Sequence, residues 1–252
     1  MTRSLPGGVL LAFDGIDGSG KTTQANLLAE AVSKYGFDVV LTKEPTNGKW
    51  GKIVRASAST GRLSPIEELE AFVADRREHV DVLIRPSLTA GKIVILDRYY
   101  FSTVAYQGAR GMDTDNLLDI NETFAPQPDA LFLLRVPPAV GLSRVAARGD
   151  VANLFEREDN LRACARIFDS IKRPFVHPVD ATRGAKEIAN EIAWAVFEGP
   201  VAGRLERPAS GPTIRADKVA AFLAATKRIA ADRSIAIRDK PEALLEIVES
   251  YT

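Results

Sequence analysis

The chain has 252 residues, 46% of them hydrophobic, which is enough to bury the core of one α/β domain with some length left over. Its 33 basic and 33 acidic residues cancel, so no whole-molecule field would attract nucleic acid or an anionic membrane. A single cysteine, Cys164, excludes an internal disulfide, and no stretch approaches the roughly 20 apolar residues of a membrane span. We therefore expect a cytoplasmic protein without nucleic-acid or membrane partners.

Short apolar runs alternate with longer stretches of helical periodicity. The predicted strands are Val9 to Phe13, Val39 to Thr42, Ile93 to Leu96, Ala130 to Val136 and Phe175 to Val179. The predicted helices are Thr22 to Tyr35, Pro65 to Ala90, Thr114 to Phe124, Pro138 to Arg148, Glu158 to Lys172 and Ala185 to Phe197. Runs that are apolar at every position indicate helices on both faces of a parallel sheet. The pattern predicts a doubly wound α/β fold.

The first strand is followed directly by GIDGSGKT, which matches the Walker A pattern and opens the first helix. Gly15, Gly18 and Gly20 let backbone N–H groups converge on phosphate oxygens. Lys21 can reach the β and γ phosphates, and the Thr22 hydroxyl can bind Mg²⁺. Because the chain has no NKxD element of the kind that reads guanine in GTP-binding switches, the loop favours an ATP-dependent kinase.

Two further elements have the right chemistry for an acceptor. Phe72 and Arg76 lie four residues apart on a predicted helix and share a face, so one can stack on a base while the other donates hydrogen bonds. Asp97 and Arg98 end the third strand at the carboxyl edge of the sheet, where the phosphate loop also lies. Asp97 can bind Mg²⁺-bound water, and Arg98 can clamp an acceptor phosphate.

The carboxyl-terminal part has a different character. Residues 199–213 contain three glycines and three prolines without periodicity, which predicts a linker after a core domain of residues 1–198. The remainder, 214–252, is predicted to form a helical extension of two amphipathic helices, Ala216 to Asp232 and Pro241 to Tyr251.

Taken in order, these residues resemble the thymidylate kinase family of P-loop nucleoside monophosphate kinases, from about Val9 to Ala195. The motifs that carry the resemblance are GIDGSGKTT, the KEP loop, the FxxxR helix, DRYYFST, AYQG, PDALFLL and GLSRVAARG. The resemblance implies transfer of the γ-phosphoryl group of ATP to dTMP, with Mg²⁺. It also implies a sheet of five parallel strands in a homodimer.

The resemblance also implies residue roles. ATP would be bound by Gly15, Ile16, Asp17, Gly18, Ser19, Gly20, Lys21, Thr22, Thr23, Arg144 and Arg157. The acceptor would be bound by Lys43, Glu44, Pro45, Phe72, Arg76, Arg98, Tyr99, Thr103, Tyr106 and Gln107. Phe72 would stack on thymine, Arg76 and Gln107 would read its polar edges, and Tyr99 and Tyr106 would line the sugar.

The catalytic set implied by the resemblance is Lys21, Arg98, Asp17 and a lid arginine, with Thr22 and Asp97 as metal ligands. One variant of the family carries an arginine in the phosphate loop after the aspartate, but here that residue is glycine. The charge on the transferring phosphoryl group would therefore come from a lid at about residues 144–157. The candidates there are Arg144, Arg148 and Arg157, with Arg148 as the first choice.

The sequence departs from the family pattern at several positions. Lys43 replaces an arginine, Thr46 and Asn47 replace a glycine pair, Asn153 stands where the lid has an arginine, and Arg135 interrupts an apolar strand. These changes bear on efficiency and acceptor choice. Two alternatives therefore stay open: a kinase of dUMP, UMP or a deoxynucleoside, and a catalytically weak nucleotide-binding regulator.

Overall fold

The computed structural model describes residues 4–60, 63–147 and 154–205. Arg148, most of the linker expected after residue 198 and the whole expected extension 214–252 lie outside this range. The side chains of residues 58–60, 154–157 and 205 are also outside it, although their backbone is helical.

The core of the fold is a parallel sheet of five strands in the order β2-β3-β1-β4-β5. The strands are β1 (Val9–Asp14), β2 (Val39–Lys43), β3 (Ile93–Asp97), β4 (Ala130–Arg135) and β5 (Val176–Asp180). All four strand pairs are parallel. The central β1 is buried along its whole length, as its apolar run from Val9 to Phe13 requires, and the buried stretch includes Asp14 at its end. The predicted five strands and their parallel arrangement are confirmed.

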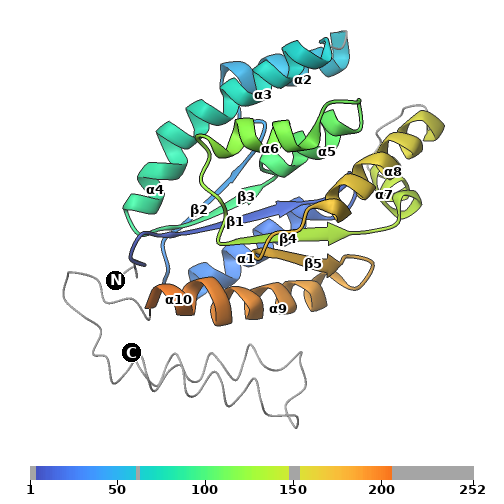
Figure 1. Cartoon of the computed structure of the whole chain (residues 1–252). Helices are drawn as coiled ribbons and strands as arrows, with labels where there is room; N and C mark the ends of the chain where they lie inside the picture. Colours follow the sequence, from blue (N-terminus) through green and yellow to red (C-terminus); the bar gives the residue numbers. More distant parts are fainter. Residues whose placement is uncertain (1–3, 61–62, 148–153, 206–252) are drawn as a thin grey trace.

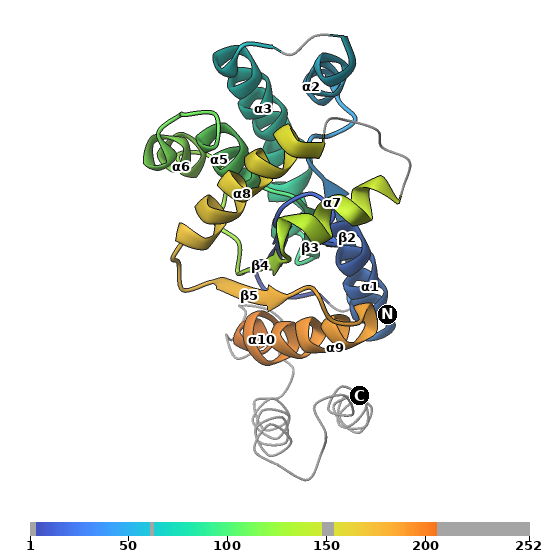
Figure 2. The same cartoon turned by 90° about the vertical axis from the view of Figure 1, so that its right-hand side faces the viewer.

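Helices cover both faces of the sheet (Figure 1). They are α1 (Lys21–Lys34), α2 (Lys49–Thr60), α3 (Pro65–His79), α4 (Arg85–Thr89), α5 (Tyr100–Gly108), α6 (Thr114–Glu122), α7 (Pro138–Ala146), α8 (Leu154–Ser170), α9 (Ala185–Val196) and α10 (Ala202–Leu205). Figure 2 shows α1, α9 and α10 on one face, with α5, α6 and α8 on the other. The doubly wound architecture is therefore confirmed. In the described part of the chain, no helix has the length and apolar character needed to cross a membrane.

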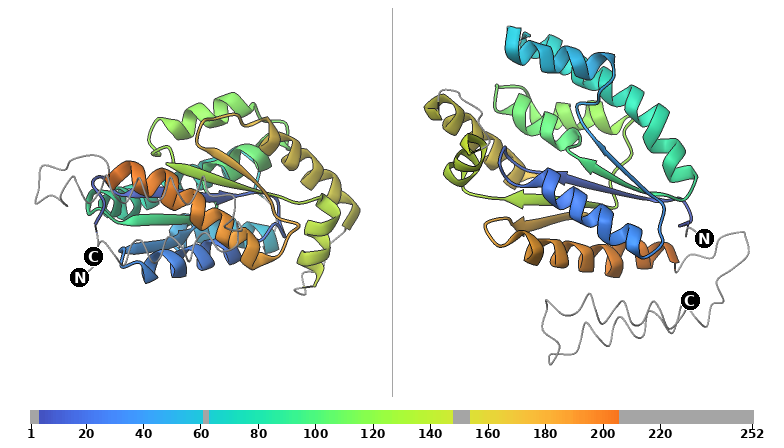
Figure 3. Two further views of the ribbon diagram at one scale, coloured as in Figure 1. Left: turned by 90° about the horizontal axis from the view of Figure 1, so that it is seen from below. Right: turned by 180° about the vertical axis from the view of Figure 1, so that it is seen from behind.

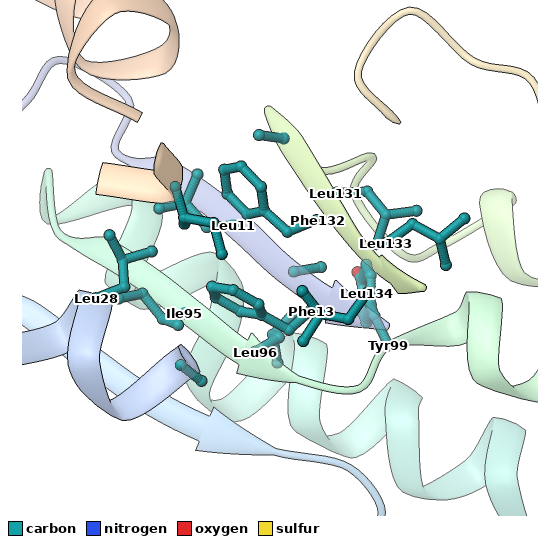
Figure 4. Close-up of a cluster of buried hydrophobic side chains, with 14 of the residues drawn as sticks. Leu11, Phe13, Leu28, Ile95, Leu96, Tyr99, Leu131, Phe132, Leu133 and Leu134 are labelled. Carbon is teal, nitrogen blue, oxygen red and sulfur yellow. The ribbon is translucent and has the colours of Figure 1, made fainter. Parts of the chain in front are cut away.

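The apolar core lies on both sides of the central strands (Figure 4). Phe13 of β1 and Phe132 of β4 pack with ring centroids 5.3 Å apart. Leu28 of α1 and Leu96 of β3 are buried in the same cluster. Each such side chain contributes about 1.5–3 kcal/mol through burial, so the sheet gives the loops at its edge a rigid base.

The start of α3 follows from its sequence. Ser64 caps the helix: its hydroxyl accepts the Glu67 N–H, and the Glu67 carboxylate accepts the Ser64 N–H, while Pro65 occupies the first turn. A π-helical turn, Val80–Ile84, connects α3 to α4, so the predicted single helix from Pro65 to Ala90 is essentially continuous. The helices α2 and α5 were not predicted.

The predicted end of the domain near residue 198 is wrong. After α9 the chain continues through a π-helical turn, Phe197–Val201, into α10, so residues 199–205 are helical and not linker. Val201 and Ala202 are buried, and Arg204 donates to Asp129 at 2.6 Å. Packing of these side chains outweighs the low helix propensity of the glycines and of Pro200.

Candidate active site

One pocket of about 590 Å³ opens at the carboxyl edge of the sheet. In Figure 1 the arrowheads of β1 and β4 point toward α7 and α8, which close this edge. The loop after β1, the loop after β2 and the end of β3 line the pocket, together with Arg55 of α2, Tyr106 of α5 and side chains of α7 and α8. The predicted phosphate loop, KEP loop and Asp97-Arg98 pair therefore meet in one space.

The phosphate loop leads directly into α1. Gly15, Gly18 and Gly20 have φ angles of 143°, 78° and 98°, which residues with side chains rarely adopt. The helix begins at Lys21 with no acidic residue in its first turn, so its positive end is available to an anion. The Lys21 ammonium donates to the carbonyls of Gly15 and Ile16 at 3.0 and 2.8 Å. These features fit a cradle for phosphates.

The phosphate loop also touches α7 backbone to backbone. A Cβ atom placed on Gly18 would lie 2.1 Å from the Gly141 carbonyl oxygen, and one placed on Gly141 would lie 2.5 Å from the Asp17 carbonyl oxygen. Neither contact leaves room for a side chain. Gly141 in α7 therefore determines how closely the helix that leads to the lid approaches the phosphate loop.

We expect Gly141→Ala to displace the phosphate loop and weaken ATP binding about tenfold, although alanine is the better helix former. Isothermal titration of Mg-ATP into the variant measures this change. Gly203→Ala is the matched control, because a Cβ atom there meets nothing within 4 Å and lies on α10. Unchanged ATP affinity in Gly141→Ala would show that the loop does not need this close contact.

The end of β1 holds the turn after β3. Arg98 has a φ angle of 72°, unusual for a residue with a side chain, and its N–H donates to the Phe13 carbonyl at 2.9 Å. Asp14, fully buried, accepts the Tyr99 N–H at 3.1 Å and the Ser102 hydroxyl. Two strands thus fix the backbone from which Arg98 extends into the pocket.

The Arg98 guanidinium lies beside the phosphate loop. It donates to the Asp17 carboxylate and, at 3.2 Å, to the Ser102 hydroxyl, while the Tyr106 ring centroid lies 5.6 Å away. Arg98, Ser102 and Tyr106 belong to the segment that runs from the end of β3 into α5, whereas Asp17 comes from the phosphate loop. Arg98 is therefore held in one position by a carboxylate and an aromatic face, close to the phosphate-binding glycines.

Burial and neighbouring charges shift the ionisation of this group. Burial, assisted by the Arg98 charge, lowers the pKa of Lys21 to about 7. Burial works against ionisation of Asp17, but the charges of Arg98 and Lys21 outweigh it and hold the pKa of Asp17 below its usual range. Burial raises the pKa of Asp14 to about 7. Added phosphate charge would stabilise the protonated form of Lys21, so the pocket is suited to an anionic ligand.

Thr22 and Asp97, the two predicted metal ligands, lie side by side: the Thr22 hydroxyl donates to the Asp97 carboxylate. A hydroxyl and a carboxylate are the hard oxygen ligands that Mg²⁺ takes, and this ion commonly completes its coordination with phosphate and water. Among residues 4–60, 63–147 and 154–205 there is no cluster of three or more His, Cys, Asp or Glu side chains that could hold a metal by itself. The pair fits a Mg²⁺ ion that arrives with a nucleotide.

Arg76, one of the two residues predicted to read the base, lies in a buried network. Arg76 is 1% exposed and donates to Glu44 at 2.8 Å, Asn121 at 2.6 Å and Thr103 at 3.0 Å. His79 contacts the other Glu44 oxygen at 3.1 Å. Of these five residues only Glu44 lines the pocket. Arg76 and Thr103 therefore support the pocket wall from behind in this structure.

Removing the arginine from this network should cost stability. We expect Arg76→Met to lower the free energy of unfolding by about 3 kcal/mol, because the buried Glu44 carboxylate loses its cation. The double variant Arg76→Met, Glu44→Gln should recover part of the loss, since it removes the uncompensated charge. Urea titration measures both. Arg77→Met, at an exposed neighbouring position, is the control; a loss equal to that of the control would contradict the prediction.

The remaining acceptor-site residues divide into two groups. Phe72 is half-buried, and Gln107 is buried and donates to Glu68 at 2.7 Å; neither lines the pocket. Tyr99, predicted to line the sugar, lies instead in the core with its hydroxyl donating to the Pro126 carbonyl at 3.0 Å (Figure 4). Burial raises the pKa of Tyr99. Tyr106 does line the pocket.

The amino-acid sequence is similar to a family of known proteins. The family model described as thymidylate kinase matches residues 13–192. The chain belongs to the thymidylate kinase family. Its similar relatives include the curated proteins named thymidylate kinase from Xanthomonas euvesicatoria pv. vesicatoria (strain 85-10), 52% identical over 211 residues that cover 84% of this chain and 92% of that protein. Others are from Xanthomonas oryzae pv. oryzae (strain PXO99A), 52% identical with 79% and 87% covered, and Xylella fastidiosa (strain M12), 48% identical with 77% and 89% covered.

Of the three candidate lid arginines in this member of the thymidylate kinase family, Arg144 has its side chain among the described residues. Arg144 of α7 donates to the Gly18 carbonyl at 3.4 Å and to the Ala181 carbonyl at 3.1 Å, so it links the phosphate loop to the loop after β5. Arg148 lies outside the described residues. Arg157 belongs to α8, but its side chain is outside them as well. Arg135 pairs with Asp169 of α8 at 2.8 Å.

Sequence reasoning missed several pocket residues of this family member. Arg55 lines the pocket and donates to the Pro45 carbonyl at 2.8 Å and to the Thr46 carbonyl, which fixes the loop after β2. Asn160 also lines the pocket and was not singled out; nor was Asp14, which is outside the lining but holds the turn that carries Arg98. A carboxylate at the end of an apolar strand could have indicated Asp14, whereas nothing in the local sequence distinguishes Arg55 or Asn160 from ordinary polar helix residues.

Proposed function

We propose that this protein transfers the γ-phosphoryl group of ATP to dTMP, giving dTDP and ADP, with Mg²⁺. The observation that carries the proposal is the single pocket that joins two ends of different chemistry. One end is the glycine-rich loop with Lys21, suited to a triphosphate. The other end presents Lys43, Arg55 and Arg98, three cations suited to a second, acceptor phosphate. Membership of the thymidylate kinase family supports dTMP as that acceptor.

The donor end would act by binding and orienting. The amides of the phosphate loop and Lys21 would hold the β and γ phosphates, with the positive end of α1 beneath them. Thr22 and Asp97 would hold a Mg²⁺ ion. When bound, that ion neutralises charge on the phosphates.

The acceptor end would place a phosphate oxygen in line with the donor. Arg98 is positioned for this by its backbone hydrogen bond to β1 and by Asp17. No general base is required, because a phosphate monoester is largely ionised at neutral pH. The two histidines fit this view, since His79 pairs with Glu44 and His177 packs against Phe132.

Additional positive charge on the transferring group would come from the lid. Arg144 already contacts the phosphate loop, while Arg148, with Arg157, would approach when the segment between α7 and α8 closes over ATP. Closure would also exclude water, which prevents hydrolysis of ATP in place of transfer.

The family resemblance supports a homodimer, and light scattering of the purified protein tests that assembly. A cytoplasmic location is part of the same proposal.

The test is ADP formation from Mg-ATP with dTMP, dUMP, UMP, dCMP, thymidine and no acceptor. We expect turnover with dTMP to exceed turnover with the ribonucleotide UMP by at least about 100-fold, because a site shaped around one sugar and base discriminates at this level. Faster turnover with another nucleotide would reassign the acceptor. ATP binding without turnover on any acceptor would contradict the proposed enzyme and favour a nucleotide-binding regulator.

A further inference from the structure

A second, mostly apolar groove lies away from the active site, between α1 and α9. The two helices run side by side on the same face of the sheet (Figure 3, right). The groove has a volume of about 330 Å³, and its apolar lining includes Leu27, Ala31, Tyr35, Ala193 and Trp194. The lining on α1 begins at Leu27, six residues beyond Lys21. None of the residues named above as binding or catalytic lines this groove.

The groove is also close to where the described chain ends. α9 continues through the π-helical turn into α10, which is anchored by the Arg204–Asp129 ion pair. The family match ends at residue 192, within α9, so α10 and everything after it lie beyond the part shared with the family model. Residues 206–252 therefore follow α10 directly and are not part of that match.

That sequence contains a suitable apolar stripe. In the predicted helix 216–232, Val219, Phe222, Leu223 and Ile229 recur at spacings of three, four and seven and share one face. The charged residues of this helix flank that face or lie opposite it. An isolated helix of this length is marginal in water, so the stripe needs an apolar surface against which to pack.

The connecting segment is long enough to reach the groove. Residues 206–215 can span up to about 33 Å when extended, at roughly 3.3 Å per residue. The groove lining on α9 runs from Lys186 to Phe197, and a helix covers that distance in about 17 Å at 1.5 Å per residue. A helix of residues 216–232 is about 26 Å long by the same rise, so it can cover the groove completely.

We propose that residues 216–232 fold back and dock their apolar face, Val219, Phe222, Leu223 and Ile229, into the α1–α9 groove of the same chain. The occupant is thus a segment of this protein and not a second molecule. Docking covers Tyr35 and Trp194 and clamps α1, the helix that carries the phosphate loop, to α9.

The test uses the full-length chain with Trp50→Phe, which leaves Trp194 in the groove as the single tryptophan. Acrylamide quenching of Trp194 is measured in this parent and after Phe222→Asp. We expect the quenching constant to rise at least about twofold, because a charged residue removes the docked helix. Ala221→Asp, on the opposite side of the predicted helix, is the matched control and should leave quenching unchanged.

The groove side is tested in the same way. Ala189→Glu places a charge in the lining and should raise quenching as Phe222→Asp does, whereas Ala185→Glu, exposed and outside the lining, should not. Hydrogen exchange should show residues 216–232 protected in the parent and unprotected in Ala189→Glu. Absence of protection in the parent, or equal quenching in all variants, overturns the proposal. An effect that disappears on dilution also overturns it, because the occupant would then be a second copy.

Discussion

Lys21→Ala is expected to lower kcat/KM for phosphoryl transfer by about 1,000-fold, which corresponds to about 4 kcal/mol of transition-state stabilisation. The Lys21 side chain is buried and fixed between the carbonyls of Gly15 and Ile16, so its charge acts in a region of low dielectric. Alanine removes that charge without disturbing the glycine geometry of the loop. Steady-state ADP formation, measured over a range of Mg-ATP concentrations at saturating dTMP, gives kcat/KM for the parent and the variant.

Lys34→Ala is the matched control for this experiment. Lys34 lies in the last turn of the same helix and is exposed, so its removal should change kcat/KM less than about twofold. A Lys21→Ala enzyme that retains more than a tenth of the parent rate would contradict the assignment of Lys21 to the donor phosphates. The phosphate loop would then bind a ligand without taking part in transfer.

Arg98→Ala is expected to lower kcat/KM for dTMP by about 100- to 1,000-fold while changing the affinity for Mg-ATP less than about threefold. The physical reason is that the guanidinium would form two parallel hydrogen bonds to the acceptor phosphate, and its backbone is fixed by Phe13 and Asp14 in a conformation that aims it at the pocket. Arg98→Lys should recover only part of the loss, because an ammonium keeps the charge but lacks the planar fork.

Thymidine, which lacks the phosphate, provides an internal comparison for this variant. Any turnover of thymidine should fall much less than turnover of dTMP, since Arg98 would have nothing to clamp. Arg173→Ala, at a partly exposed site remote from the pocket lining, is the control variant. Equal losses with dTMP and thymidine would mean that Arg98 supports the fold of the pocket, through Asp17 and Ser102, more than it binds the acceptor phosphate.

The sequence alone determined the class of fold and the form of the loop that is predicted to bind the donor phosphates. Apolar runs such as Ile93–Leu96 are buried on both faces in a layered α/β domain. The local pattern therefore predicts the strands and also their parallel arrangement, because helices alternate with them along the chain. The glycines of the phosphate loop and Lys21 form their site within one short segment. Their geometry is therefore encoded locally, and the structure reproduces it.

Two of the helical segments that were not predicted, α5 and the segment from Phe197 into α10, show where local pattern fails. α5 carries buried aromatic and polar residues around most of its circumference, so its sequence has no single apolar stripe. The chain after Phe197 contains glycines and Pro200, which read as a linker, yet Val201 and Ala202 are buried and keep it helical. In both cases packing against the rest of the domain outweighs local propensity.

Tertiary structure alone decided which acceptor-side residues reach the pocket. Arg76 and Tyr99 have side chains that could contact a nucleotide, but Arg76 pairs with Glu44, Asn121 and Thr103, and Tyr99 packs in the core. Arg55, which no motif marked, does line the pocket. The outcomes for Arg76 and Tyr99 depend on contacts between residues 27 to 45 positions apart, for which the local sequence carries no signal. The sequence thus specified the chemistry available, and only packing of distant segments decided which side chains face the ligand and which support them.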